Sequence, residues 1–335
     1  MGVITAQSTS ATGPVLAIDA GNSKTDVALV AADGSVLATA RGGGFQPPVV
    51  GVEAALDVLG SAVDEALATA RAQRADLGAV EHVSACLANA DLPVEEEELA
   101  AAILLRGWAP TAEVRNDTFA VLRAGVDEPR GVAVVCGAGI NCAGMLPDGR
   151  TVRFPAIGKI SGDWGGGGGL SDEAMWHAAR AEDGRGEPTA LARTLPAHFG
   201  LDSMYALIEA LHRKNIPAAR RHEVVPVLFA TSADGDPVAR SLVRRQAEEI
   251  IVMSTVALAK LGLLEEEVPV LLGGSVVAAR HPELDGQIAA LMAEKAPKAV
   301  IRVVTAPPVL GAALFGLDRL GAPAAARTKL RAYYV

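Results

Sequence analysis

The sequence predicts an α/β fold made of two lobes, and three observations lead to it. The chain has 335 residues and is half hydrophobic, which is too long for one average domain and comfortable for two. Segments with strand patterns alternate with segments of helical period. A unit of strand, Gly turn, strand, Asp-Gly turn and strand occurs twice, which indicates the internal duplication of a lobe. Two unrelated three-stranded meanders are the alternative, since such meanders are common local structures.

The first copy opens with three short strands, expected at 15–18, 25–30 and 36–40. Gly21-Asn22-Ser23 marks the turn after the first strand, and Asp33-Gly34 gives a strong hairpin signal after the second. The elements expected next are a helix over 51–74, a strand over 80–87, a helix over 94–105 with an acidic first turn, a short strand over 113–115 and a helix over 118–124.

The second copy begins at Gly131. Its strands are expected at 131–136, 140–145 and 150–154, with turns at Gly137-Ala138-Gly139 and Pro147-Asp148-Gly149. The elements expected after it are a helix ending near 181, helices within 188–222, a long helix over 239–261, strands over 268–272 and 300–304, a helix of small residues over 309–320 and a basic, solvated tail around 327–331.

Composition excludes several classes of function. The net charge of −9 repels nucleic-acid backbones, so nucleic acid is not an expected partner. No stretch approaches the ~18 apolar residues that span a membrane. The first thirteen residues hold no Lys or Arg and no apolar core, so we expect a disordered start and no secretory signal. Cys86, Cys136 and Cys142 are expected to be buried structural thiols in a reducing cytoplasm.

The segment from Asp19 to Thr25 is a candidate phosphate site. It is not a P-loop, because a strand and not a helix follows the glycine. A β-hairpin can nevertheless cradle phosphate if its Gly lets the backbone come close and its polar groups point inward. The groups in question belong to Gly21, Asn22, Ser23, Lys24 and Thr25. Asp19 can hold the Mg²⁺ that accompanies a nucleotide, directly or through water. An ordinary hairpin is the alternative.

Two further Gly turns support the phosphate-binding interpretation. Gly137, Ala138 and Gly139 occupy the matching point of the second copy, which suggests that two lobes face one ligand. Gly273, Gly274 and Ser275 follow another apolar strand, where a flat adenine can lie against backbone without side chains.

Asn116-Asp117 ends a predicted strand and precedes a helix. A carboxylate there can accept the proton of an attacking hydroxyl. Asp117 also fits the N-cap of the helix, and the local sequence leaves both interpretations open.

Asp163 and Trp164 are followed by five glycines and by Ser171-Asp172-Glu173. We interpret this stretch as a pocket wall that ends at a helix start, where carboxylates can bind hydroxyl groups. A flexible linker is one alternative. Ser171 as the N-cap of that helix is compatible with either.

Together these motifs give the chain, from about 15 to 320, a resemblance to the BadF/BadG/BcrA/BcrD ATPase family of the actin–hexokinase–Hsp70 superfamily, and within it to the N-acetylglucosamine kinase type. The phosphate motifs resemble 19–25 and 137–141, the adenosine motif resembles 272–275, and the Asn-Asp pair is similar to the family's catalytic aspartate. The family segment Gly-Trp-Gly-x-x-x-Gly-Asp-Glu-Gly-Ser resembles 163–173, with Asp172-Glu173 at its acidic position.

Two departures from the family concern substrate selection. Where such kinases usually carry a Ser/Thr-Asn pair, the chain reads Gly42-Gly43-Gly44-Phe45-Gln46, and Gln46 is a substitute on a longer arm. In the acidic segment, Ala174 and Met175 stand where Gly-Ser is usual. Neither departure touches the phosphate motifs.

The resemblance implies two ribonuclease-H-like lobes with a nucleotide cleft between them. The expected lobes are 15–127 with 308–320, and 128–307, with tails at 1–14 and 321–335. It implies an ATP-dependent kinase that phosphorylates an amino sugar, N-acetylglucosamine or glucosamine, with Mg²⁺ held at Asp19 and Asp117 as catalytic base. The expected substrate-binding residues are Gln46, Asn116, Asp117, Asn141, Asp163, Trp164, Asp172 and Glu173. The resemblance also implies a cytoplasmic homodimer.

Two other functions share this fold. The activator ATPase of 2-hydroxyacyl-CoA dehydratases needs Cys ligands for an iron–sulfur cluster, but the chain has three Cys and Cys136 lies in the phosphate-turn strand. A sugar-sensing regulator without catalysis usually adds a helix-turn-helix, for which the residues ahead of the first strand are too few.

Overall fold

A computed structural model describes residues 13–74 and 76–334 of the chain. The expected disordered start therefore lies, up to residue 12, outside the described residues. The described chain divides into two compact units. Unit 1 contains the described residues up to Pro129 and from Val304 onward, and unit 2 is Arg130–Val303.

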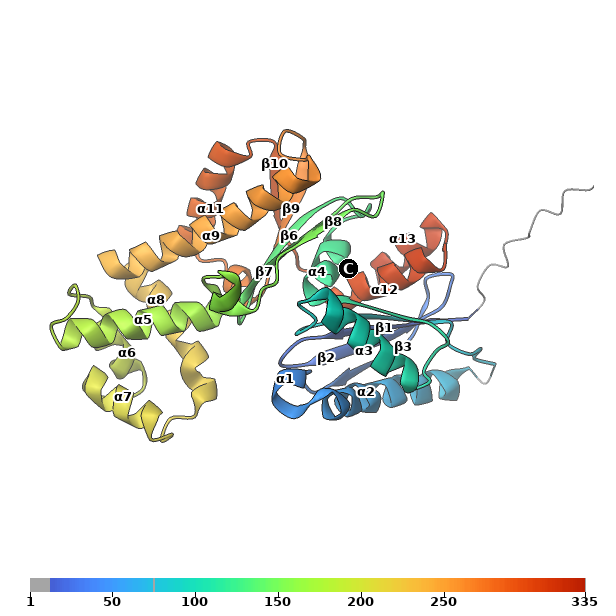
Figure 1. Cartoon of the computed structure of the whole chain (residues 1–335), viewed down its shortest axis with the longest axis horizontal. Helices are drawn as coiled ribbons and strands as arrows, with labels where there is room; N and C mark the ends of the chain where they lie inside the picture. The colour runs from blue at the N-terminus through green and yellow to red at the C-terminus, as the bar shows by residue number, and fades with distance from the viewer. Residues whose placement is uncertain (1–12, 75, 335) are drawn as a thin grey trace, which may run out of the picture. The chain divides into compact units, whose positions relative to one another are not determined.

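Unit 1 is built on a five-stranded sheet with the order β3-β2-β1-β4-β5 (Figure 1). Its strands are β1 (Val15–Ala20), β2 (Thr25–Val30), β3 (Val36–Gly42), β4 (His82–Leu87) and β5 (Ala112–Asn116). The first three strands pair antiparallel, whereas β1, β4 and β5 run parallel. The carboxyl ends of β1, β4 and β5 therefore lie at one edge of the sheet.

Helices cover both faces of this sheet. They are α1 (Pro47–Val50), α2 (Val52–Gln73), α3 (Pro93–Leu105), α4 (Asp117–Gly125), α12 (Pro308–Arg319) and α13 (Ala324–Tyr333). Alternation along β1 sends Leu16 and Ile18 into the core beneath α2 and α3 and turns Val15 toward α12. A Cβ added at Gly316 would lie 2.2 Å from the side chain of Val15, so glycine lets α12 pack directly on the sheet.

The end of the chain is an ordered helix and not the tail that the sequence suggested. Leu330 is fully buried, and Arg331 donates a hydrogen bond to the carbonyl of Ala124. Lys329 pairs with Asp33 at 2.8 Å. The expectation of a solvated end was wrong because Ala326 and Leu330, four residues apart among the charged residues, are buried against the rest of unit 1.

Unit 2 has a second five-stranded sheet, in the order β10-β9-β6-β7-β8. Its strands are β6 (Gly131–Cys136), β7 (Ile140–Met145), β8 (Thr151–Arg153), β9 (Val268–Gly273) and β10 (Ala299–Val303). Strands β6 to β8 pair antiparallel, and β9 and β10 continue the sheet in parallel with β6. This plan repeats that of unit 1 strand by strand, which confirms the predicted internal duplication.

The helices of unit 2 are η1 (Gly158–Ser161), α5 (Gly166–Glu182), α6 (Leu191–His198), α7 (Met204–His212), η2 (Ala218–Glu223), α8 (Val224–Ala233), α9 (Pro237–Leu261), α10 (Ser275–Ala278) and α11 (Pro282–Lys295). Helix α9 packs on β6, β7 and α11, and α5 packs against α6 and α8 (Figure 1). Among the described residues, no helix has the length and apolar character needed to span a membrane.

Candidate active site

The turn between β1 and β2 exposes its backbone at the carboxyl edge of the unit 1 sheet. Gly21 N–H donates to the carbonyl of Lys24 at 2.9 Å and closes the turn, while Asn22 and Ser23 lie exposed at its tip. A Cβ at Gly21 would come no nearer than 3.7 Å to other atoms, so open space lies beside this glycine. The turn therefore offers polar groups and accessible backbone to a ligand.

Two of the residues expected to bind phosphate already have partners in the fold. The buried Thr25 hydroxyl donates to the carbonyl of Gly43 at 2.8 Å. Lys24 pairs with Asp26 at 2.9 Å, and Arg41 pairs with the same carboxylate at 2.6 Å. Burial opposes ionisation of Asp26, but these hydrogen bonds outweigh it and hold its pKa below the usual value. Lys24 can reach a phosphate only by leaving Asp26.

The segment after β3 lies against this turn. Gln46 donates to the carbonyl of Asn22 at 2.7 Å, and Phe45 N–H donates to the carbonyl of Gly21. A Cβ at Gly44 would lie 2.1 Å from the Asn22 carbonyl oxygen, which explains a glycine at that position. The unusual Gly-rich stretch thus supports the turn, and the Gln46 amide is engaged in that support.

Asn116, and not Asp117, is the N-cap of α4. The Asn116 side chain accepts a hydrogen bond from Thr118 N–H at 3.0 Å, the defining contact of a cap. Its amide donates to Asp91, and its backbone N–H donates to Glu96. Asp117 is the first residue of the helix, so the alternative that it is the N-cap is wrong.

Asp19 and Asp117 form an electrostatically coupled pair at the sheet edge. Burial, followed by the charges of Asp117 and Asp26, raises the pKa of Asp19 well above its usual value, while Lys24 acts in the opposite direction. Burial also raises the pKa of the half-buried Asp117 to about 6, against backbone N–H groups that favour its charged form. A cation beside Asp19 would offset this concentration of negative charge.

The loop after β4 adds residues that the sequence reasoning did not single out. Asn89 donates to the Asn22 side chain at 3.0 Å and to the Phe45 carbonyl at 3.1 Å. It does so from a left-handed backbone conformation, with φ 61°. Asp91 accepts from the Asn116 amide. Asn89 and Asp91 follow the carboxyl end of the parallel strand β4, and Asn116 ends the parallel strand β5. This shared position at strand ends was the signal in the sequence that could have identified Asn89 and Asp91.

In unit 2 the turn between β6 and β7 rests on the start of α5. The carbonyls of Gly137 and Ala138 accept hydrogen bonds from Gly167 and Gly168 at 2.7 and 2.8 Å. Ala138 and Gly139 are exposed, and Asn141 follows them in β7, where its side chain accepts from Cys142 N–H. The second predicted phosphate turn is therefore a fixed loop with accessible backbone.

Glycine is required where these loops touch. A Cβ at Gly166, whose φ is +69°, would lie 2.4 Å from the backbone of Gly139. A Cβ at Gly274, whose φ is +88°, would lie 2.3 Å from the carbonyl oxygen of Cys136. Gly273 and exposed Ser275 flank that contact. The five glycines are thus a packed helix start, and the flexible-linker alternative is wrong.

The acidic segment is not placed as expected. Helix α5 begins at Gly166, so Ser171, Asp172 and Glu173 lie inside the helix and not at its start. Buried Ser171 donates to the carbonyl of Gly167 as an interior residue, and exposed Asp172 forms an ion pair with Arg221. The expectation was wrong because a run of glycines usually forms a loop, whereas here hydrogen bonds to the turn between β6 and β7 stabilise the glycines as the first turn of a helix.

Asp163 lies in the loop just before α5. Its carboxylate accepts hydrogen bonds from Gly158 N–H at 3.1 Å and from the Ser161 hydroxyl. The guanidinium of Arg245 stacks 4.2 Å from the ring of Trp164, which is buried and whose indole N–H has no partner among the described residues. Asp163 and Trp164 are therefore held in one ordered loop.

The cysteines are buried in the two sheets, Cys86 in β4, Cys136 in β6 and Cys142 in β7. Burial raises the pKa of each thiol, that of Cys136 to about 12. Buried, protonated thiols of this kind do not fit the cysteine ligands that the iron–sulfur cluster of a dehydratase activator needs.

A family model, described as the BadF/BadG/BcrA/BcrD ATPase family, matches residues 16–316. The chain belongs to this family. Its match spans both units, so the resemblance inferred from the motifs is confirmed.

Individual relatives agree. The N-acetylmuramic acid/N-acetylglucosamine kinase of Clostridium acetobutylicum is 24% identical over 265 residues, which cover 78% of this chain and 85% of the relative. The N-acetyl-D-glucosamine kinase of Dictyostelium discoideum is 25% identical over 245 residues, which cover 70% and 75%. A crystal structure described as that of a candidate N-acetylglucosamine kinase from Chromobacterium violaceum has a TM-score of 0.67 at 22% identity, covering 91% of this chain and 99% of the other. The last similarity confirms the two-lobed fold class.

Proposed function

We propose that the protein is an ATP-dependent sugar kinase that phosphorylates an amino sugar, N-acetylglucosamine or glucosamine. The observation that carries this proposal is the arrangement at the carboxyl edge of the unit 1 sheet. There the carboxylate of Asp117, which is not the helix cap, acts on Asp19 and raises the pKa of Asp19, and Asp19 directly precedes the accessible phosphate turn. The membership in a family of ATPases and the names of both relatives support it.

In this proposal Asp117 accepts the proton of a sugar hydroxyl. The hydroxyl oxygen attacks the γ-phosphorus of ATP, the bond from that phosphorus to the bridging oxygen breaks, and ADP leaves. The pKa of about 6 keeps Asp117 ionised at neutral pH and basic enough to receive the proton. The backbone of the Gly21–Lys24 and Gly137–Gly139 turns binds phosphate oxygens, and Gly273–Ser275 contacts the nucleoside.

Asp19 fits a role in holding Mg²⁺. Its buried carboxylate has a charge that neighbouring carboxylates destabilise, which a cation relieves. Among the described residues no cluster of three His, Cys, Asp or Glu could hold a metal, so water and nucleotide oxygens would complete the coordination, as is usual for Mg²⁺. When bound, the ion supplies charge neutralisation to the phosphates.

We further propose that Asp163 occupies the acidic position of the family segment. The pattern Gly-x-x-x-Gly-Asp-x-Gly fits Gly158, Gly162, Asp163 and Gly165 at the family's spacing, with Trp164 in place of Glu. Asp172 and Glu173 lie further along α5, where Asp172 is occupied by Arg221. Asn116, Asn141 and Gln46 remain candidates for orienting the sugar. The homodimer and the cytoplasmic location remain predictions from the sequence.

Competition kinetics test the substrate class. We expect ADP release to depend on N-acetylglucosamine or glucosamine, and to be weaker with N-acetylmannosamine and glucose. If none of the four sugars is phosphorylated while ATP is still hydrolysed, the sugar-kinase part of the proposal is wrong.

A further inference from the structure

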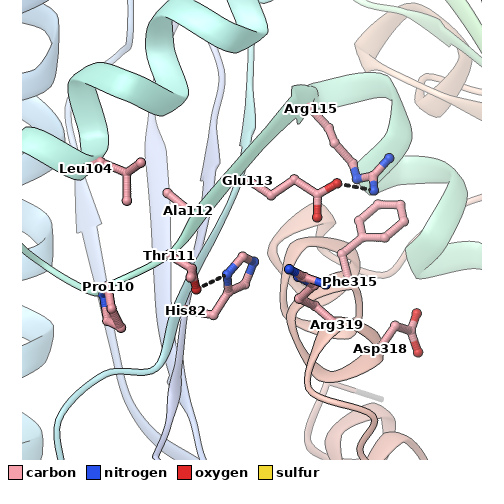
Figure 2. Close-up of a pocket in the computed structure, with 10 residues that line it drawn as sticks. All are labelled: His82, Leu104, Pro110, Thr111, Ala112, Glu113, Arg115, Phe315, Asp318 and Arg319. Carbon is pink, nitrogen blue, oxygen red and sulfur yellow. Dashed lines mark hydrogen bonds and ion pairs between the residues drawn. The ribbon is translucent and has the colours of Figure 1, made fainter.

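A polar cavity lies within unit 1, at the β5 edge of its sheet. It has a volume of about 740 Å³ and is formed by the start of β4, the strand β5 and the last turn of α12 (Figure 2). His82, which lines it, opens β4 and is therefore at the opposite end of that strand from Asn89 and the candidate active site. Nothing in the proposed phosphoryl transfer uses this cavity.

The cavity contains a cation without a partner. Arg319 is exposed and, within the described part of the chain, makes no ion pair and donates no hydrogen bond. The neighbouring charges are already matched, because Arg115 pairs with Glu113 and Asp318 pairs with the buried Arg123 at 2.9 Å. The cavity therefore has an unmatched positive charge in a chain that is acidic overall.

His82 offers this cavity a hydrogen-bond acceptor. Its side chain is buried, and its Nδ1 lies 2.9 Å from the Thr111 hydroxyl. That hydroxyl donates its only proton to the carbonyl of Glu81, so His82 Nδ1 must be the donor and Nε2 carries a lone pair. Nε2 is buried and has no partner among the described residues, and the ring points from Thr111 toward Arg319 (Figure 2).

The electrostatics keep this imidazole neutral. Burial lowers the pKa of His82, and the charge of Arg319 lowers it further, against the opposing effect of Glu113. A buried acceptor without a donor is costly and is satisfied by a hydroxyl or N–H group of a ligand. The apolar wall of the cavity, which includes Phe315 and Pro110, suits the carbon face of a ring.

We propose that this cavity is a binding site for a hydroxylated organic anion of the size of a sugar phosphate. Its anionic group pairs with Arg319, and one of its hydroxyl groups donates to His82 Nε2. The choice of a sugar phosphate among such anions rests on the proposed function, because the kinase itself would produce that class of molecule. The site is separate from the one in which the product is made.

Calorimetric titration of the full chain with glucosamine 6-phosphate tests this. The active site is first filled with a non-hydrolysable ATP analogue and amino sugar, so that remaining binding reports a second site. We expect one equivalent to bind, and Arg319→Ala to weaken binding about 10- to 100-fold through loss of a charge-assisted hydrogen bond. Arg319→Lys should restore part of the affinity. Arg71→Ala removes an exposed arginine of α2 that, within the described part of the chain, also has no ion pair; it is the matched control and should change nothing.

The hydroxyl contact has its own test. Wild-type protein should bind glucosamine 6-phosphate more tightly than inorganic phosphate or glucosamine, and His82→Phe should reduce the preference over inorganic phosphate. Should that buried substitution unfold the protein, the Arg319 variants decide alone. Absence of binding with the active site filled, or binding that Arg319→Ala leaves unchanged, overturns the proposal. Because the titration needs no turnover, it measures binding to the cavity even if the protein phosphorylates no sugar.

Discussion

Asp117 is the residue on which the proposed chemistry depends most. Asp117→Asn keeps the shape of the side chain but cannot accept a proton, so we expect kcat to fall by ~10²–10⁴-fold. The steady-state rate of ADP release at saturating substrate measures this kcat. Because burial disfavours the charged carboxylate, the variant should be at least as thermally stable as the parent, which is the control for folding. Near-normal turnover would show that Asp117 has no role as a base.

The raised pKa of Asp117 predicts a pH dependence. A general base acts only when it is deprotonated, so kcat/KM should be constant above a pH of about 6 and fall as the pH drops below it. The expected limiting slope is about one decade per pH unit, for loss of one proton-accepting group. Initial rates over a series of buffers of constant ionic strength measure the profile. A profile that rises toward acid pH would mean that another group limits the reaction.

Asp163 and Asp172 distinguish the two assignments of the acidic segment. Asp163→Asn should raise the KM for the sugar by about tenfold or more, because a carboxylate that accepts hydroxyl protons is lost. Asp172→Asn breaks only an exposed ion pair with Arg221 and should leave the kinetics unchanged. Measuring the KM for the sugar and the KM for ATP separately in both variants distinguishes the two assignments. The reverse ranking of the two variants would restore the original assignment at Asp172.

At the scale of elements, a substitution in a Gly turn can distinguish an effect on ATP binding from an effect on packing. A Cβ at Gly137 would meet no atom nearer than 4.0 Å, so Gly137→Ala should fold normally. It should still raise the KM for ATP, since a methyl group would stand where phosphate approaches the backbone. Gly286→Ala in α11, where a Cβ meets nothing within 4 Å, is the control: it should leave the KM for ATP unchanged and raise stability slightly, because alanine is favoured over glycine inside a helix. Equal changes in the KM for ATP in both variants would argue against phosphate binding by the turn at Gly137.

Elements with a clear period were predictable, and those defined by contacts were not. The strands from Thr25 to Val30 and from Gly131 to Cys136 have the predicted bounds, because apolar runs between turn residues are local signals. The start of α5 was missed because Gly166 becomes helical only through contact with Gly139. Likewise, only the buried position of Leu330 shows that the last helix belongs to unit 1.

The same distinction applies to the candidate site. The Asn116-Asp117 pair and the Gly21 turn stood out as motifs, since strand ends with polar residues are visible in sequence. The engagement of Thr25 with Gly43 and the contact of Asn89 with the turn involve residues 18 and 67 positions apart, which no local pattern reveals. Sequence therefore pointed to the sheet edge at which we propose the chemistry, but it did not separate supporting residues from those proposed to bind ligands.

At the scale of the whole molecule, the duplicated sheet gives each unit a meander whose first turn exposes backbone. Unit 1 adds two acidic residues to this turn, Asp19 and Asp117, and unit 2 adds the glycines of α5 and β9. The division suits a phosphotransferase, in which one half supplies charge and a base and the other supplies backbone donors for a nucleotide.

The identity of the phosphorylated product tests the central claim most directly. The full chain is incubated with ATP, Mg²⁺ and N-acetylglucosamine or glucosamine, and phosphorus NMR follows the fate of the γ-phosphate. We predict a sugar phosphate ester formed in equal amount to ADP, and its loss in Asp117→Asn. Release of inorganic phosphate alone, or ester formation at an undiminished rate in Asp117→Asn, would contradict the account.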